Sequence, residues 1–197
     1  MILNLDCRHG LAMLPDNSVD AIVCDPPYGL RFMGKKWDYD VPAVDIWVEC
    51  LRVLKPGGHL LAFAGTRTQH RMAVRIEDAG FEISDMIAWV YGSGYPKHRS
   101  SLKPALEPIT MARKPAPRAT LLNIDACRVG DEGGCKSDGT DERTESQAGA
   151  IGAYKTSPPV PGLGRYPANL IHDGSPEVLA LFPDSAGSGG QRAERQN

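Results

Sequence analysis

Residues 21–29 read AIVCDPPYG, an apolar strand pattern that runs directly into an acidic, proline-rich turn. Because proline fixes its own φ near about −65° and disfavours the α region for the residue before it, Asp25 and Pro26 are held extended. Neither proline has an N–H group, so the Pro26 carbonyl is free to accept a hydrogen bond from a ligand. Gly29 then lets the chain leave with an unusual φ. Open α/β sheets bind ligands at turns of this kind, after the carboxyl end of a strand.

This turn offers the groups that suit an amino group attached to a flat ring. Such an amine on a nucleobase is a poor nucleophile because its lone pair is delocalised into the ring. The Asp25 carboxylate and the Pro26 carbonyl can accept its two N–H groups and draw the lone pair out of the ring. Tyr28 can stack on the base, a contact worth about 1–3 kcal/mol. The alternative is a plain Pro-Pro turn with Asp25 as a cap.

The same residues resemble those of a known family. Asp25-Pro26-Pro27-Tyr28 resembles the catalytic tetrapeptide of S-adenosylmethionine-dependent DNA amino-methyltransferases, which methylate adenine N6 or cytosine N4. Residues 5–20 are similar to the strand and helix that precede this motif in the permuted β class. The resemblance implies S-adenosylmethionine as cofactor, double-stranded DNA as partner, and the four motif residues as catalytic.

The resemblance also implies that Asp6 and Asp25 contact the methyl donor. For Asp6, the open alternative is an N-cap of the helix that follows it. An Asp rather than a Ser at the first motif position favours adenine N6 as the target, and cytosine N4 stays open.

In the permuted class the catalytic motif comes first and a Gly-rich donor loop comes last. No such loop is found after the motif, so we expect the chain to be the N-terminal part of a methyltransferase. A missing C-terminal donor-binding half, or a dimer partner, is then expected to complete it. Without the strand that carries that loop, residues 21–24 would form a bare apolar edge, which is a pairing hazard.

Other functions stay open beside this one. Ribosomal RNA guanine-N2 methyltransferases carry the same tetrapeptide after their donor loop, and the 24 residues before Asp25 leave little room for that order. A catalytically incomplete remnant that binds only nucleic acid is a second alternative. An interaction protein that merely uses the fold is a third.

Strand and helix patterns alternate along the first half of the chain. The expected strands are residues 1–5, 19–24, 59–64, 81–90 and 108–113. The expected helices, from apolar residues at a helical period, are residues 8–14, 41–54 and 67–79. This order predicts an α/β fold with a mostly parallel sheet and helices on both faces. The resemblance implies the same, a Rossmann-like arrangement, with residues 1–118 as the catalytic core.

Residues 119–197 have a different character and form an irregular or mobile region, a candidate target-recognition segment. Residues 130–152 are rich in Gly, Ser, Thr and charge, which is typical of a disordered insertion. Further on, residues 168–171 are expected to be extended and residues 176–181 to form a short helix.

Composition and charge bound the remaining possibilities. The 197 residues are 42% hydrophobic and 23% charged, enough for one ordinary core. No apolar run approaches about 18 residues and no signal peptide is evident, so a cytoplasmic protein is expected. The five cysteines show no Cys-x-x-Cys pairing. Cys127 and Cys135 lack a nearby His pair, so neither a metal site nor a disulfide is expected.

Basic residues gather in one stretch although the net charge is −2. Residues 97–118 hold six Lys or Arg and the single acid Glu107, a local balance of +5. We expect Lys97, Arg99 and Lys103 to bind DNA phosphates, which usually dominate the affinity of proteins for DNA. The alternative is a solvated loop.

Overall fold

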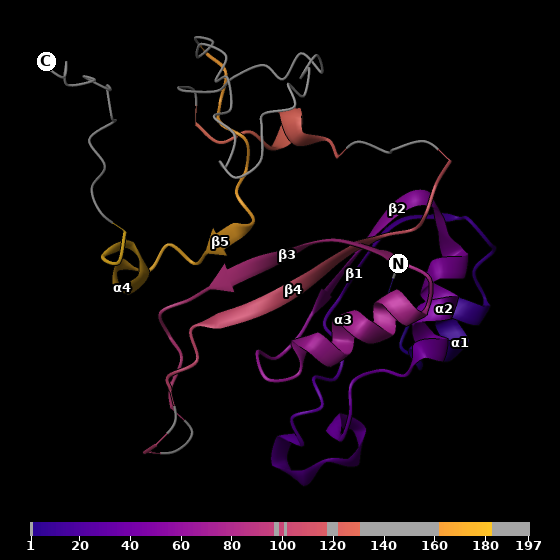
Figure 1. Cartoon of the computed structure of the whole chain (residues 1–197). Helices are drawn as coiled ribbons and strands as arrows, with labels where there is room; N and C mark the ends of the chain where they lie inside the picture. The colour runs from indigo at the N-terminus through magenta and orange to yellow at the C-terminus, as the bar shows by residue number, and fades with distance from the viewer. Residues whose placement is uncertain (1, 97–98, 101, 118–121, 131–161, 183–197) are drawn as a thin grey trace, which may run out of the picture. The chain divides into compact units, whose positions relative to one another are not determined.

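A computed structural model of the chain describes residues 2–96, 99–100, 102–117, 122–130 and 162–182. The chain divides into two compact units. The first comprises Met1–Pro115 together with Leu170–Asn197, and the second comprises Ala116–Asn169. The five-stranded sheet in Figure 1 belongs to the first unit.

The strand order of this sheet is β1-β2-β4-β3-β5. The strands are β1 (Val19–Cys24), β2 (Leu54–Phe63), β3 (Glu82–Val90), β4 (Leu106–Arg113) and β5 (Leu170–His172). β1 is parallel to β2 and β3 is parallel to β5, whereas β4 is antiparallel to both of its neighbours. Four strands therefore run in one direction, and the expected α/β class with a mostly parallel sheet is confirmed.

The reversed strand β4 makes the sheet mixed. Helix α2 (Val44–Val53) connects β1 to β2, and helix α3 (Gln69–Asp78) connects β2 to β3, so each connection returns the chain in the same direction. The connection from β3 to β4 has no helix among its described residues. The chain therefore turns back and inserts β4 between β2 and β3.

The first three α-helices of the chain lie on one face of the sheet, whereas helices on both faces were expected. α1 (Cys7–Ala12) contacts α2, α2 contacts α3, and the three lie together below the strands in Figure 1. Both crossovers advance across the sheet in the same sense, and their common right-handedness places their helices on the same face. No helix of the described ranges is long and apolar enough to cross a membrane.

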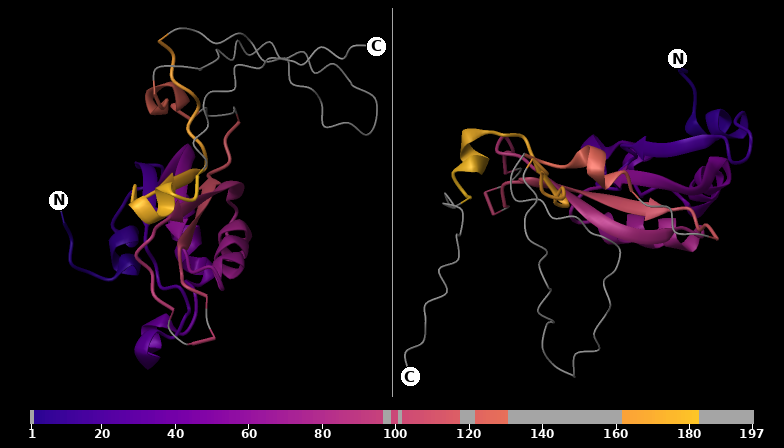
Figure 2. Two further views of the ribbon diagram at one scale, coloured as in Figure 1. Left: turned by 90° about the vertical axis from the view of Figure 1, so that its left-hand side faces the viewer. Right: turned by 90° about the horizontal axis from the view of Figure 1, so that it is seen from above.

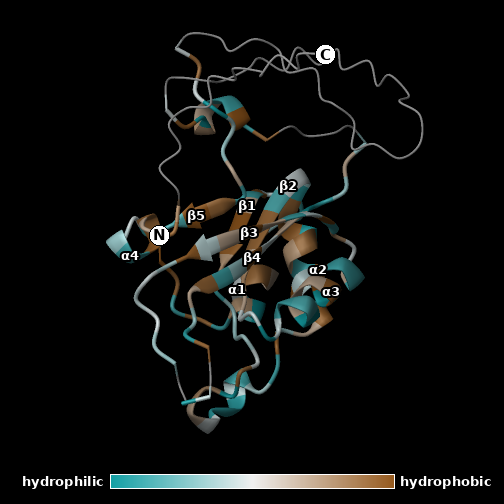
Figure 3. Cartoon of the chain, turned by 60° about the vertical axis from the view of Figure 1, so that its left-hand side comes forward, coloured by the Kyte–Doolittle hydropathy of each residue, from teal (hydrophilic) through white to brown (hydrophobic). Residues whose placement is uncertain are grey.

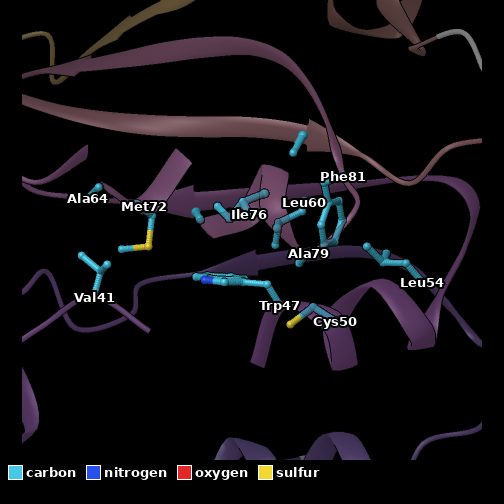
Figure 4. Packing of buried hydrophobic residues seen from close by; sticks show 12 residues of the cluster. Val41, Trp47, Cys50, Leu54, Leu60, Ala64, Met72, Ile76, Ala79 and Phe81 are labelled. Carbon is cyan, nitrogen blue, oxygen red and sulfur yellow. The ribbon is translucent and has the colours of Figure 1, made fainter. Parts of the chain in front are cut away.

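The hydrophobic core lies between this helix layer and the sheet. Trp47 of α2, Met72 and Ile76 of α3 and Leu60 of β2 are almost completely buried there (Figure 4). Burying a large apolar side chain stabilises the fold by about 1.5–3 kcal/mol. Figure 3 shows the hydrophobic colours concentrated in the sheet, with teal along much of the helices.

Two local expectations need correction. Residues 2–5 form no strand, because Ile2 and Leu3 are exposed and have no strand to pair with among the described residues. β2 begins at Leu54 and includes residues 55–58, whereas the expected strand began at residue 59. Gly58 is needed in this irregular stretch, since a Cβ there would lie 2.9 Å from the carbonyl oxygens of two other residues.

The C-terminal part of the first unit completes the sheet. β5 pairs with the end of β3, where Val90 lies opposite His172, and α4 (Pro176–Leu179) follows it. Both appear in yellow in Figure 2. The extended segment and the short helix expected in this part of the sequence are therefore present.

The described part of the second unit includes a short 3₁₀ helix, Ile124–Cys127. Arg128 Nε donates to Asp125 Oδ1 at 2.8 Å, and the Arg128 guanidinium lies 4.3 Å from the ring centroid of Tyr166. The stretch 130–152 lies outside the described residues apart from its first residue.

β1 stands at the edge of the sheet and pairs only with β2 among the described strands, as expected from the sequence. Val23 is 67% exposed, and it points away from the helix layer. The strand that leads into Asp25 is thus held on one side only, in the described part of the chain.

We expect Leu60→Ala to lower the free energy of unfolding by about 2–5 kcal/mol, because it leaves a cavity in the core. Val23→Ala, on the same sheet but exposed, should change it by about 0.5 kcal/mol or less. Urea unfolding followed by circular dichroism measures both. Equal losses for the two variants would contradict the core described above.

Candidate active site

A cavity of about 840 Å³ opens at the carboxyl end of β1. Asp25, Pro26, Pro27 and Tyr28 all line it, so the structure brings the four predicted motif residues to one cavity. Asp25 is exposed, while the two prolines and Tyr28 are half-buried. The acceptor groups of the motif are therefore accessible to a ligand at the position where α/β sheets bind ligands.

Tyr28 is held by a carboxylate from a distant strand. Its hydroxyl donates to Glu107 Oε2 of β4 at 3.2 Å. Burial raises the pKa of Tyr28, and the carboxylates of Asp25 and Glu107 raise it further. Tyr28 therefore stays a protonated hydrogen-bond donor at neutral pH, with its ring fixed at the cavity wall.

The segment after Tyr28 forms the outer wall of the cavity. We call residues 29–39 the Asp38 loop, because the buried Asp38 side chain holds it closed. Asp38 Oδ1 accepts from the Gly29 N–H and Asp38 Oδ2 from the Phe32 N–H, each at 2.8 Å. The Arg31 N–H donates to the Asp38 carbonyl at 2.7 Å. One carboxylate thus ties both arms of the loop together beside the motif.

The backbone of the Asp38 loop is strained. Gly29 has φ 69°, and a Cβ there would lie 3.0 Å from the backbone nitrogen of Val41, so glycine is required. Arg31 and Met33 also adopt left-handed φ values, 58° and 49°. Such residues cost about 1–3 kcal/mol each and cluster at functional sites.

A second cavity, of about 980 Å³, lies against the same prolines. Its other walls come from α1, α2 and the residues before α2, and include Cys7, Leu11 and Trp47. Trp47 Nε1 is buried and has no hydrogen-bond partner within the described structure. Asp25, Pro26 and Pro27 border both cavities, so two ligands could meet at this segment.

Asp6 directly precedes Cys7 in the sequence, and Cys7 lines this second cavity, but Asp6 itself does not line it. Its Oδ1 accepts from the Arg8 N–H at 2.9 Å, so it is the N-cap of α1. The capping interpretation of Asp6 is therefore what the structure shows, and a contact with the methyl donor stays a prediction.

Of the predicted DNA-binding residues that the structure describes, neither Arg99 nor Lys103 lines either cavity. Lys97 lies outside the described residues, and Arg99 is exposed. Lys103 forms an ion pair with Glu177 of α4. Lys114, from the same basic stretch, instead donates to the Leu54 carbonyl at 2.8 Å at the opposite end of β4. The described basic residues between 97 and 118 therefore do not form one patch.

Three features of the site were missed in the sequence: Glu107, Arg67 and the Asp38 loop. The loop left a signal, because residues 29–40 show no strand or helix pattern and long irregular loops are often functional. Glu107 left no signal in the sequence, because only the pairing of β4 with β2 brings its side chain to Tyr28. No group of three or more His, Cys, Asp or Glu in the described ranges is arranged to hold a metal ion.

Comparison with known proteins gives consistent matches. Residues 19–156 match the family model described as DNA methylase, of the N6/N4 methyltransferase type. The chain is 33% identical over 132 residues to the type II methyltransferase M.HpaI of Haemophilus parainfluenzae, covering 60% of this chain and 40% of that protein. It is 30% identical over 167 residues to the DNA adenine methyltransferase YhdJ of Escherichia coli K12, covering 81% and 52% respectively.

The chain thus spans about half the length, or less, of these two curated relatives. Among solved structures, the putative DNA modification methylase TTHA0409 of Thermus thermophilus is 27% identical, with a TM-score of 0.44. That match covers 61% of this chain and 56% of the other.

The thiols beside the motif provide a test of the site. Burial raises the pKa of Cys24 to about 12 and that of Cys50 to about 11. Both thiols therefore stay protonated, and slow to react, at pH 8. We expect iodoacetamide to modify the exposed Cys7 of α1 well before Cys24 or Cys50, as read by peptide mass spectrometry.

In urea all three cysteines should react at similar rates, which serves as the control. Rapid modification of the half-buried Cys24 in the folded protein would contradict the raised pKa of its thiol.

Proposed function

The chain belongs to the N6/N4 DNA methylase family, and we propose that it transfers a methyl group from S-adenosylmethionine to the exocyclic amino group of a flipped DNA base, with adenine N6 the favoured target. The observation that carries this proposal is that two cavities meet at Asp25, Pro26 and Pro27. One cavity presents an aromatic ring beside two acceptors, as a base requires. The other is large and lined mainly by apolar groups, as a nucleoside donor requires.

On the base side, the first cavity would take the target base after it leaves the duplex. Extrusion costs a few kcal/mol, and stacking on Tyr28 would return about 1–3 kcal/mol. The Asp25 carboxylate and the Pro26 carbonyl would accept the two N–H groups of the amine. As the amine attacks, positive charge develops on its nitrogen, and the carboxylate would stabilise that charge.

On the donor side, the second cavity has room for a nucleoside, and the Trp47 side chain forms part of its wall. These features fit S-adenosylmethionine, which when bound supplies an electrophilic methyl group on a sulfonium. Asp25 would lie near that positive centre from the shared wall, and Asp6 at the start of α1 would lie near the adenosine. The residues of this chain would position the two reactants for direct transfer.

The choice of adenine N6 rests on Asp25 at the first motif position. It is supported by the similarity to YhdJ, which is named a DNA adenine methyltransferase. Cytosine N4 is the second candidate. Analysis of the methylated nucleosides in the product distinguishes the two.

We expect Asp25→Ala to lower methyl transfer by about a hundredfold or more, because one charged acceptor at the reacting amine is lost. The protein is assayed with labelled S-adenosylmethionine and duplex DNA. Asp45→Ala, which removes an exposed carboxylate of α2, is the matched control and should keep full activity. Retained turnover by Asp25→Ala would refute the assigned role.

The basic stretch gives a separate test of the DNA partner. Lys97→Ala with Arg99→Ala should weaken binding to all duplex sequences alike. Each phosphate contact contributes about 0.9 to the slope of log affinity against log salt, so two should reduce that slope by about 2. Fluorescence anisotropy over a salt series measures it. A loss confined to one DNA sequence would instead mean that these residues read bases.

A further inference from the structure

We propose that the Asp38 loop is a wedge that enters the DNA duplex and fills the space left by the target base. This inference rests on the proposed function, because it needs a base that leaves the duplex for the first cavity. It assigns to residues 29–39 a contact with stacked bases that the motif itself does not make.

The first observation is a group of exposed apolar side chains at the cavity mouth. Met33 is 80% exposed, Trp37 61% and Phe32 51%, and all three line the first cavity. The rings of Phe32 and Trp37 lie 6.5 Å apart and tilted, which leaves ring surface free for another partner. Large apolar side chains gathered on an exposed loop mark an interaction surface.

The second observation is charge. Arg31, Lys35 and Lys36 accompany the apolar side chains in the same loop, and Arg67 lies across the cavity mouth. The Asp38 carboxylate within the loop is buried and accepts backbone N–H groups, so the exposed side of the loop is cationic. An apolar tip flanked by cations fits stacked bases flanked by phosphates better than it fits a neutral protein surface.

The third observation is rigidity. The two hydrogen bonds to Asp38 and the left-handed backbone at Met33 hold the tip in one shape before any partner binds. A preformed loop loses little conformational freedom when it binds. Proteins that kink or open DNA insert Phe, Leu, Ile or Met side chains between bases in this way.

The position of the loop completes the argument. Its apolar side chains form one wall of the cavity whose other walls carry Asp25 and Tyr28. A base that enters the cavity therefore leaves its gap in the duplex next to the tip. Filling that gap with Phe32 and Met33 would stabilise the open duplex.

The test uses a short labelled duplex with and without a single abasic site, which removes the cost of extruding a base. A protein that fills the gap should bind the abasic duplex about tenfold more tightly than the intact one. We expect Phe32→Ala with Met33→Ala to reduce this preference to about twofold or less. Val48→Ala, an exposed apolar residue of α2, should leave the preference unchanged.

Each result is decisive. If the double variant keeps the wild-type preference while its urea midpoint is unchanged, the wedge is wrong and DNA binding stands. If wild type binds neither duplex, the proposed function fails and the wedge fails with it.

Trp37 provides a second readout that does not depend on affinity. Trp47 is buried and Trp89 is half-buried, so the measurement uses a Trp89→Phe background, in which acrylamide quenching should report mainly on Trp37. Bound DNA should lower that quenching about threefold or more. Quenching that stays unchanged when DNA is bound would mean that the loop faces another partner, and would overturn the proposal.

Discussion

The parallel pairing of β1 with β2 sets the residue at which β1 ends and the turn begins. Val23 lies opposite Leu61 and Cys24 opposite Ala62, and the ladder ends there because the two prolines that follow have no N–H groups to donate. Asp25 is consequently the first residue after the last paired residue of β1, and its side chain is exposed at this edge of the sheet. The positions of Tyr28 and the Asp38 loop depend on where this ladder ends.

Two contacts between distant parts of the sequence then give the site its shape. Glu107 reaches Tyr28 across 79 residues of sequence, and Asp38 closes the loop from within. Both use carboxylates, but to different ends: Glu107 fixes a ring, whereas Asp38 satisfies backbone N–H groups and keeps strained residues in place. The positions of the aromatic groups around Asp25 thus depend on acids that are separate from the motif.

The local parts of this structure could be predicted from sequence, and the long-range parts could not. The strand over residues 19–24 was predicted correctly, because an apolar run that ends before two prolines depends only on its own neighbours. The strand over residues 108–113 was expected, but its place between β2 and β3 depends on a pairing that no local pattern encodes. Glu107 was therefore counted only as the one acid among basic residues.

The basic stretch was also misjudged, because a count of charges along the sequence does not give their positions in space. Charge counted along the sequence suggested one patch, yet a strand rises about 3.3 Å per residue, so Arg113 lies about 20 Å from Glu107. Arg113 pairs there with Glu82. The error at residues 2–5 has a similar origin, because an apolar run becomes a strand only where another strand offers it hydrogen bonds.

The edge position of β1 has a mechanical consequence. An interior strand is anchored on both sides, but within the described chain β1 is anchored on one, and alternate amides along its outer side have no strand to meet. The turn that carries Asp25 is therefore held from its far end, by the contacts of Tyr28 and Gly29, more than from the strand before it. Any polypeptide that paired with the outer side of β1 would add a second support directly before the carboxylate.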